Sequence, residues 1–318
     1  MNIEEYFAQR TIIQENLLNF LDDESNDEEK YYDLCKIIED IKIRDNCHEL
    51  RLFLRLISKI SANYHRNPNF FLKIDRILGL FKDEIKRYYS SAEIFNIFKK
   101  NKRILLFLLE EKIMIIDEYI LQIMTSMKYK NMEYPQYFAP EIKSIVNEKF
   151  KNNNDFDKKL LIEWANKELP ENFYELRKEG ENKHFICKLI RNDSVVDFIA
   201  YLNKNNISPN SKISESKYET NYFLMKKQKD LSIKLIEYAA FFGSIQIFNY
   251  LKFQGVQLNP SLLLFAIHSK NSELIHIIEE NNANSNSFCL QSCIESIKCH
   301  HNEIVNYLYD NYLQNEAD

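Results

Sequence analysis

Apolar residues recur at intervals of three and four along the first 150 residues, which is the period of an amphipathic α-helix. Stripes of this kind cover 50–60 and 71–81. Ser90 or Ser91 then begins another stripe, because serine is a favoured N-cap residue, and a break at Asn101 separates it from the next. This pattern predicts consecutive helices joined by short turns.

Several segments interrupt the helical pattern. The stretch 128–140 holds two prolines, so it predicts a connector rather than a helix. Helices are expected again at 141–150 and 156–169, with a domain boundary somewhere in 151–180. The stretch 203–230 is largely polar and rich in Asn, Ser and Lys, and it predicts a loop or an insertion between helix pairs.

The composition agrees with a helical fold. Of the 318 residues 45% are hydrophobic, which is enough for a sizeable core, but only four are glycine and six are proline. All-β folds need many tight turns, and those turns usually need glycine. We therefore predict an all-α protein.

The charge disfavours nucleic acid as a partner. The formal net charge is −5, whereas a nucleic-acid-binding domain usually carries a basic face. The densest basic cluster, at 99–103, lies between two helical stretches and predicts a solvated turn between helices.

The sequence shows no signal peptide at its N-terminus. Its most apolar stretch, 104–127, contains five charged residues, too many for a membrane span. The six cysteines fall within helical patterns and are expected to stay reduced. We therefore expect an intracellular, cytoplasmic protein with no membrane insertion.

The most specific pattern is at 235–259, which reads Leu-Ile-Glu-Tyr-Ala-Ala-Phe-Phe-Gly-Ser and then Ile-Gln-Ile-Phe-Asn-Tyr-Leu-Lys-Phe-Gln-Gly-Val-Gln-Leu-Asn. Ala239 and Ala240 are small enough to let helices approach closely. Gly243 and Gly255 permit the left-handed backbone that ends a helix. The segment resembles an ankyrin module, with its Leu-His-x-Ala-Ala-x-x-Gly-His and Gly-Ala-x-x-Asn elements.

The same register recurs further along the chain. A second unit has Leu263, Ala266, Ile267, Asn271, Leu274, Ile275, Ile278, Asn282 and Ala283 at corresponding places. A weaker third unit has Ile297, His300, His301, Asn302, Ile304, Val305 and Leu308, with Ser296 in the alanine slot. A degenerate opening unit is expected at 187–202. The stretch 97–109 is either a more distant unit or part of an ordinary helical bundle.

Longer motifs give a closer resemblance. The chain is similar to a very large ankyrin-repeat protein family of parasitic protozoa that carries a domain of unknown function. The resemblance implies an intracellular ankyrin protein with an unassigned partner, and it supplies no catalytic residue. The motifs that carry it are at 179–182, 186–195, 219–221, 236–247, 260–262, 266–269 and 295–302, and in the N-terminal half at 101–108 and 134–138.

Motifs for chemistry are scarce. No glycine lies within four residues of another, so a phosphate-binding Gly-rich loop is excluded. One group contains the residue types of a zinc site, namely Cys289, Cys293, Cys299, His300 and His301. Structural zinc sites usually follow one closely spaced pair of cysteines with a second pair of ligands. Helix packing for Cys293 and a turn position for the histidines are therefore favoured. We expect no catalytic residue, no cofactor and no bound metal.

These observations lead to a three-part prediction for an all-α chain. A helical N-terminal region, with or without degenerate repeats, occupies 1–150. A helical connector with the opening repeat and a polar loop occupies 151–230. A short ankyrin-repeat solenoid of helix-turn-helix units occupies 231–318.

The predicted function is a non-enzymatic scaffold that binds an unidentified protein partner. Candidate contact residues are Tyr238, Phe241, Phe242, Gln257, His268 and Asn284, because aromatic and Asn-type groups at exposed ends suit interfaces. Core packing is the alternative for the three aromatic residues. Two other functions stay open: an effector or enzyme with its activity in the N-terminal half, and a structural element that self-associates.

Overall fold

The computed structural model describes residues 2–23, 28–63, 69–125, 133–149, 156–281 and 289–313. Within these ranges the regular structure is helical, and the one β-type pairing is an isolated bridge between Lys212 and Lys234. The predicted all-α fold class is confirmed. The chain divides into two compact units, unit 1 with residues 1–61 and 65–178 and unit 2 with residues 62–64 and 179–318.

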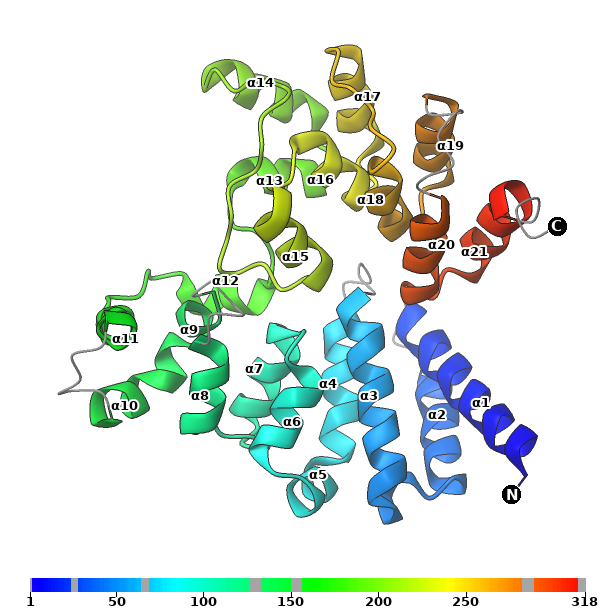
Figure 1. Cartoon of the computed structure of the whole chain (residues 1–318), viewed down its shortest axis with the longest axis vertical. Helices are drawn as coiled ribbons and strands as arrows, with labels where there is room; N and C mark the ends of the chain where they lie inside the picture. Colours follow the sequence, from blue (N-terminus) through cyan, green and yellow to red (C-terminus); the bar gives the residue numbers. More distant parts are fainter. Residues whose placement is uncertain are drawn as a thin grey trace. The chain divides into compact units, whose positions relative to one another are not determined.

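Unit 1 consists of short helices that pack on their neighbours (Figure 1). Their bounds are α1 Ile3–Asp22, α2 Glu28–Asp40, α3 Cys47–Asn63, α4 Phe70–Leu80, α5 Lys82–Tyr88, α6 Ser91–Phe98, α7 Lys102–Glu110, α8 Glu118–Thr125, α9 Glu133–Tyr137, α10 Ala139–Lys149, α11 Phe156–Asn166 and α12 Phe173–Glu179. A 3-10 turn, η1, lies at Ile43–Asp45. Among the described helices we find none with the length and apolarity that crossing a membrane requires.

Side-chain caps fix several of these helix starts. Ser90 caps α6 in a capping box with Glu93, and Asn101 accepts hydrogen bonds from the backbone N–H groups of Arg103 and Ile104 at the start of α7. Both satisfy donors that have no partner inside a helix. The predicted helix start at Ser90 and the break at Asn101 are confirmed.

The predicted connector at 128–140 is wrong where the structure describes it, because residues 133–137 and 139–140 are helical. Pro135 lies in the first turn of α9 and Pro140 in the first turn of α10. In a first turn the missing proline N–H removes no helical hydrogen bond, so proline is tolerated there. Burial of Tyr137 and Phe138 then holds the segment in place.

The predicted solvated turn at 99–103 is only partly correct. Lys99 and Lys100 form the turn, but Lys102 and Arg103 begin α7 and are buried. Arg103 contacts Asp75 at 3.3 Å, and the Lys102 ammonium lies 5.1 Å from the ring centroid of Tyr137. Buried cations need such partners, and the local sequence does not reveal them.

Unit 2 continues with shorter helices of nearly uniform length. Their bounds are α13 Phe185–Arg191, α14 Val195–Lys204, α15 Tyr222–Leu231, α16 Leu235–Phe242, α17 Ile245–Phe253, α18 Leu262–Ser269, α19 Ser272–Asn281, α20 Cys289–Lys298, α21 Asn302–Leu308 and η4 Tyr309–Leu313. The prediction of a loop or an insertion between helix pairs at 203–230 is confirmed in its second form, because α15 lies between α14 and α16. Phe223 of α15 is buried and stacks on Phe241 at a ring distance of 5.8 Å, which explains why this otherwise polar segment is helical.

Eight of these helices form four consecutive pairs. We call α13, α16, α18 and α20 the inner helices, because α13 packs on α16, α16 on α18 and α18 on α20 (Figure 1). We call α14, α17, α19 and α21 the outer helices, and each packs on the inner helix that precedes it. Apolar side chains from all four pairs join one core that runs from Cys187 to Leu308.

The turn inside each pair has the same backbone conformation. One residue takes a left-handed conformation in each turn: Asp193, Gly243, Lys270 and His300, with φ of 49°, 65°, 54° and 57°. In every case its N–H donates to the carbonyl three residues earlier. This bond satisfies a carbonyl that the ending helix leaves unpaired. The predicted left-handed conformation of Gly243 and of Gly255, which has φ of 80°, is confirmed.

Polar contacts connect the first two turns directly. The Asp193 carboxylate accepts hydrogen bonds from the backbone N–H groups of Gln246 and Ile247, each at 3.0 Å, and so caps α17 of the next pair. The Ser244 hydroxyl donates to the carbonyl oxygen of Ile190 at 2.5 Å. The first two helix pairs are thus held in register through both the apolar core and their turns.

We predict that Gly243→Ala destabilises unit 2 by about 1–2 kcal/mol or more, because left-handed backbone disfavours a side chain. The added Cβ would also lie 3.2 Å from the Ser269 Cβ. The control is Gly79→Ala in α4, where no atom lies within 4 Å of the new Cβ. That substitution should raise stability by roughly 0.5–1 kcal/mol through helix propensity. Urea unfolding of the full chain measures both, and a neutral or stabilising Gly243→Ala contradicts the turn geometry.

Candidate functional site

The predicted contact residues differ in their exposure. Gln257 is exposed, in the loop between α17 and α18, and Phe242 is half-buried at the end of α16. Asn284 lies outside the described residues. Gln257 is therefore the predicted contact that is freely available to a partner, and Phe242 offers part of its ring.

The other three predicted contacts lie in the core. Tyr238, Phe241 and His268 are each at most 2% exposed. Phe223 of α15 covers the latter two, with ring distances of 5.8 Å to Phe241 and 4.2 Å to His268. The core-packing alternative therefore fits Tyr238 and Phe241, and none of the three side chains is accessible to a partner in this structure.

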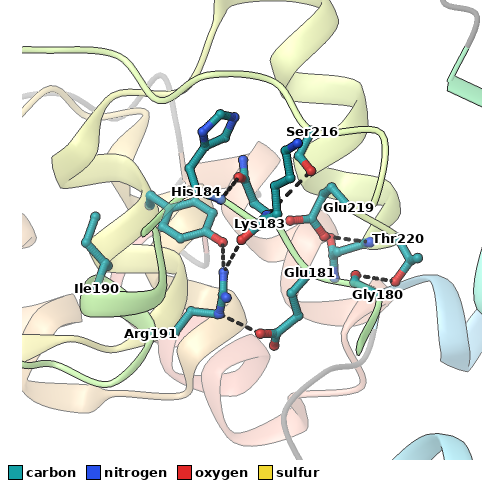
Figure 2. Close-up of polar contacts among 12 residues, drawn as sticks. Gly180, Glu181, Lys183, His184, Ile190, Arg191, Ser216, Glu219 and Thr220 are labelled. Atoms are coloured by element: carbon teal, nitrogen blue, oxygen red, sulfur yellow. Dashed lines mark hydrogen bonds and ion pairs between the residues drawn. The ribbon is translucent and has the colours of Figure 1, made fainter. Parts of the chain in front are cut away.

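Two motifs that carry the family resemblance, 179–182 and 219–221, lie against each other in unit 2 (Figure 2). The backbone N–H and the hydroxyl of Thr220 both donate to the Gly180 carbonyl, at 2.9 and 2.8 Å. Gly180 has φ of 72°, and a Cβ there would lie 2.8 Å from the Thr220 hydroxyl oxygen. Glycine is needed for both reasons. These motifs join distant parts of the chain rather than forming an open site.

Arg191 at the end of α13 occupies the centre of this network. Figure 2 shows it beside Glu181, with which it forms an ion pair. Its guanidinium also donates to the Asn182 carbonyl at 2.9 Å and to the Tyr238 hydroxyl at 3.0 Å. Burial raises the pKa of Tyr238 well above its ordinary value, so this phenol stays neutral. Arg191 therefore ties α16 to the segment before α13.

Asn182 is fully buried and fixes the loop that precedes α15. Its side-chain N–H donates to the Ser214 carbonyl at 2.8 Å, and its side-chain oxygen accepts from the His184 backbone N–H at 3.0 Å. Ser216 contributes a longer contact to the Lys183 backbone N–H. The Asn182 side chain thus finds its partners within the chain, which is the behaviour of a structural support.

A second polar group lies between α18 and α20. His268, Glu295 and Cys299 are buried, and their candidate ligand atoms all lie within 4.8 Å of one another. The Nε2 atom of His268 is 3.2 Å from a Glu295 carboxylate oxygen. The sequence pattern points to His268 and Cys299 separately but not to this trio, because 27 residues separate His268 from Glu295. Only the register of consecutive helix pairs indicates that these three positions lie close together.

These residue types occur in zinc sites and in nucleophilic triads, but the geometry does not fit a triad. The Cys299 sulfur is 3.5 Å from Nδ1 and 3.9 Å from Nε2 of His268. The lone-pair directions of the two ring nitrogens diverge, so a sulfur almost equidistant from both lies along neither. Burial also raises the pKa of the Cys299 thiol far above its ordinary value, which disfavours the reactive thiolate.

Burial and the neighbouring Lys298 determine the protonation states of Glu295 and His268. Burial raises the pKa of Glu295, but hydrogen bonds from His268 and Lys298 outweigh it and leave a pKa of about 2. Burial lowers the pKa of His268 against the opposing effect of Glu295. We conclude that a neutral His268 donates to an ionised Glu295, and that Lys298 supplies the compensating charge at 2.9 Å.

His301 follows the left-handed residue of the last turn and is 7% exposed. Its Nδ1 atom has no hydrogen-bond partner among the described residues. Burial, assisted by the charges of Lys270, His268 and His300, lowers the pKa of His301 to about 3. The predicted turn position of His300 and His301 is confirmed, and Cys293 is buried as the packing interpretation expects. The side chain of Cys289 lies outside the description.

Unit 1 contains a cavity of about 490 Å³ lined by polar side chains of α1 and α2 and of the residue after α1. The lining residues are Asn16, Asn19, Asp22, Asp23, Lys30 and Asp33. Most of them are exposed, whereas acid–base catalysis needs a carboxyl group shielded from water. The cavity gives no geometric support for catalysis.

Comparison of the chain with protein-family models, with curated proteins and with solved structures finds no match. The assignment of function therefore rests on the residues and geometry of the chain itself.

We predict that Arg191→Met destabilises unit 2 by about 2–3 kcal/mol, since it leaves the buried Tyr238 hydroxyl and the Asn182 carbonyl without their donor. Arg191→Lys should lose less, because it retains the charge. The control is Lys188→Met, an exposed position on the same helix, which should change stability by less than about 0.5 kcal/mol. Urea unfolding measures all three, and equal effects at 188 and 191 contradict a central role for Arg191.

The buried His301 predicts acid sensitivity. Its folded pKa of about 3 lies below the ordinary value of 6.5, so below pH 6.5 the unfolded chain binds a proton that the folded chain does not. Stability should fall as the pH drops from 6.5 towards 3, by at most about 2 kcal/mol at pH 5. His301→Gln should flatten this dependence in thermal melts, whereas His276→Gln, whose side chain is 62% exposed, should not. An unchanged slope in His301→Gln contradicts the assignment.

Proposed function

We propose that this chain is a non-enzymatic scaffold that binds another protein, and that unit 2 is a short ankyrin-type stack. The observation that carries the proposal is the common register of four helix pairs, each with a left-handed residue at the same place in its turn. Stacked modules of this kind share a core, and their turns and inner helices form an extended surface for recognition.

The spacing of the left-handed residues supports the ankyrin assignment. From Gly243 to Lys270 is 270 − 243 = 27 residues, and from Lys270 to His300 is 300 − 270 = 30 residues. Both are slightly short of the ankyrin period of about 33. From Asp193 to Gly243 is 243 − 193 = 50 residues, and the excess accommodates the loop at 205–221 and α15.

The resemblance to ankyrin proteins of parasitic protozoa belongs to the same proposal. The motifs at 179–182 and 219–221 contact each other through Gly180 and Thr220, and Glu181 of the first motif forms an ion pair with Arg191 of α13, so they specify a fold rather than a reaction. A fold signature without catalytic residues is consistent with a binding protein in an intracellular, cytoplasmic setting.

A protein partner fits the chemistry of the described groups better than a small substrate. The group of His268, Glu295 and Cys299 in unit 2 is buried. The exposed side chains of its loops are instead polar, as at Gln257, and a net charge of −5 disfavours nucleic acid. Polar groups on rigid loops suit the rim of a protein interface.

We predict that Gln257→Arg weakens capture of the partner at least about tenfold, because a new charge at an interface must be desolvated. The matched control is Asn249→Arg, the same change in charge at an exposed position of outer helix α17. The full-length chain serves as bait for quantitative pull-down from its native cell, and both variants should melt like the parent chain.

Three results contradict the proposal. The first is that no protein is captured above background at low salt, which also contradicts the general scaffold function. The second is an equal loss of partner capture in both variants, and the third is unchanged capture by Gln257→Arg. The second and third contradict only the loop between α17 and α18 as the contact.

A further inference from the structure

The buried trio of His268, Glu295 and Cys299 has donor atoms that suit a metal ion. It offers an imidazole nitrogen, a carboxylate oxygen and a sulfur, and these atoms all lie within 4.8 Å of one another. Among the described residues no other group of three histidine, cysteine or acidic side chains comes as close together. Nitrogen, oxygen and sulfur ligands in one site are typical of zinc, whereas calcium and magnesium prefer oxygen alone.

The distances within the trio are close to those that zinc requires. With bonds of about 2.0 Å to nitrogen and oxygen and about 2.3 Å to sulfur, a tetrahedral site places nitrogen roughly 3.3 Å from oxygen and roughly 3.6 Å from sulfur. The Nε2 atom of His268 lies 3.2 Å from a Glu295 oxygen and 3.9 Å from the Cys299 sulfur. The sulfur also lies 3.5 Å from Nδ1, so binding requires the Cys299 side chain to turn towards the Nε2 side of the ring.

The charges of the trio balance those of a divalent ion. Glu295 is ionised and contributes one negative charge. A thiol that coordinates zinc loses its proton, so Cys299 contributes the second as a thiolate. His268 is a neutral ligand, and its proton moves from Nε2 to Nδ1 when Nε2 binds the ion. One proton therefore leaves overall, and the two positive charges of zinc are neutralised, as a buried site requires.

Lys298 supports Glu295 in the position that a ligand needs. The lysine ammonium contacts the Oε2 atom of Glu295 at 2.9 Å, which leaves Oε1, the oxygen beside His268, to face the metal. Carboxylate ligands in metal sites are commonly held by such a second contact. The Lys298 side chain is 51% exposed, so the route by which an ion reaches the trio passes this lysine.

The side of α20 that carries Glu295 is unusually polar for a buried helix face. Ser292 and Glu295 stand eight and five residues before the left-handed residue of their turn, where α18 has the buried Leu262 and Phe265. The Ser292 hydroxyl has no hydrogen-bond partner among the described residues, and the same is true of Nδ1 of His301. Buried polar atoms of this kind often indicate a bound water or ion.

We propose that His268, Glu295 and Cys299 bind one zinc ion between α18 and α20. A water molecule completes the four ligands, as in other zinc sites with three protein ligands. The ion joins two consecutive inner helices, and because the trio is buried we assign it a structural role. The spacing of the cysteines by itself predicts no metal, since it does not contain the contact between the two helices. The zinc site does not depend on the capture of a protein partner.

Equilibrium dialysis of the full chain against Zn²⁺, after removal of metals by a chelator and in a reductant that does not bind zinc, provides the first test. We expect one zinc ion per chain. Loss of a second contact to a ligand costs about 10–100-fold in affinity, so loss of a ligand in Cys299→Ser or Glu295→Gln should cost at least about a hundredfold.

Two controls separate the trio from other zinc ligands. Cys293→Ser removes a buried thiol of the same helix outside the trio, and His276→Gln removes an exposed histidine that lies 3.6 Å from Glu279. Both variants should bind zinc like the parent chain. The proposal is overturned if the parent chain binds no zinc, if Cys299→Ser keeps full affinity, or if either control loses as much affinity as Cys299→Ser.

Cobalt as a probe reports the sulfur ligand directly and does not depend on how far a variant is destabilised. Co²⁺ bound to a thiolate absorbs in the near ultraviolet through charge transfer from sulfur, so the parent chain should show this band with one equivalent of Co²⁺. Cys299→Ser should lose the band, whereas Glu295→Gln retains the sulfur and should show it at higher Co²⁺ concentration. A parent chain without the band, or a band of full strength in Cys299→Ser, contradicts the assignment.

A structural ion should also stabilise the folded chain. Zinc at about a hundred times its dissociation constant should raise the midpoint of thermal unfolding by at least about 3 °C, because the complete site exists only in the folded state. His268→Gln should lose this shift. Zinc that binds without raising the midpoint, or a shift that persists in His268→Gln, is incompatible with an ion that joins α18 to α20.

Discussion

A pair of short amphipathic helices cannot bury its apolar surface by itself, and this constraint determines the architecture of unit 2. Each inner helix must be covered by its own outer helix and by the neighbouring pairs. The pairs can stack in register only if their turns share one shape, and Asp193, Gly243, Lys270 and His300 provide it. Three of these positions take the left-handed conformation without glycine, and in the first of them the Asp193 carboxylate also caps the next pair.

The buried polar groups of this unit serve the same stacking. Arg191, Asn182 and Thr220 hold the long insertion before α16 against the first pair. The trio of His268, Glu295 and Cys299 links the next two inner helices across their seam. Each set is surrounded by apolar side chains, where a satisfied polar network fixes one arrangement of the helices. Such a network makes the packing of the helices specific, which is consistent with the proposed binding of a partner at the protein surface.

The sequence by itself determined the helical class, the helix start at Ser90, the left-handed conformations of Gly243 and Gly255, and the register of the last three helix pairs. These features depend on neighbours within a few residues, so local spacing encodes them. Tertiary structure decided which side chains are accessible. The sequence offers Tyr238, Phe241 and His268 as surface contacts, but α15 places Phe223 over Phe241 and His268. Lys102 and Arg103 find buried partners far along the chain. The exposure of Ile297, against the burial of Ile267 at the same place one pair earlier, likewise depends on what packs next. Burial is a property of segments distant in sequence, and no local pattern contains it.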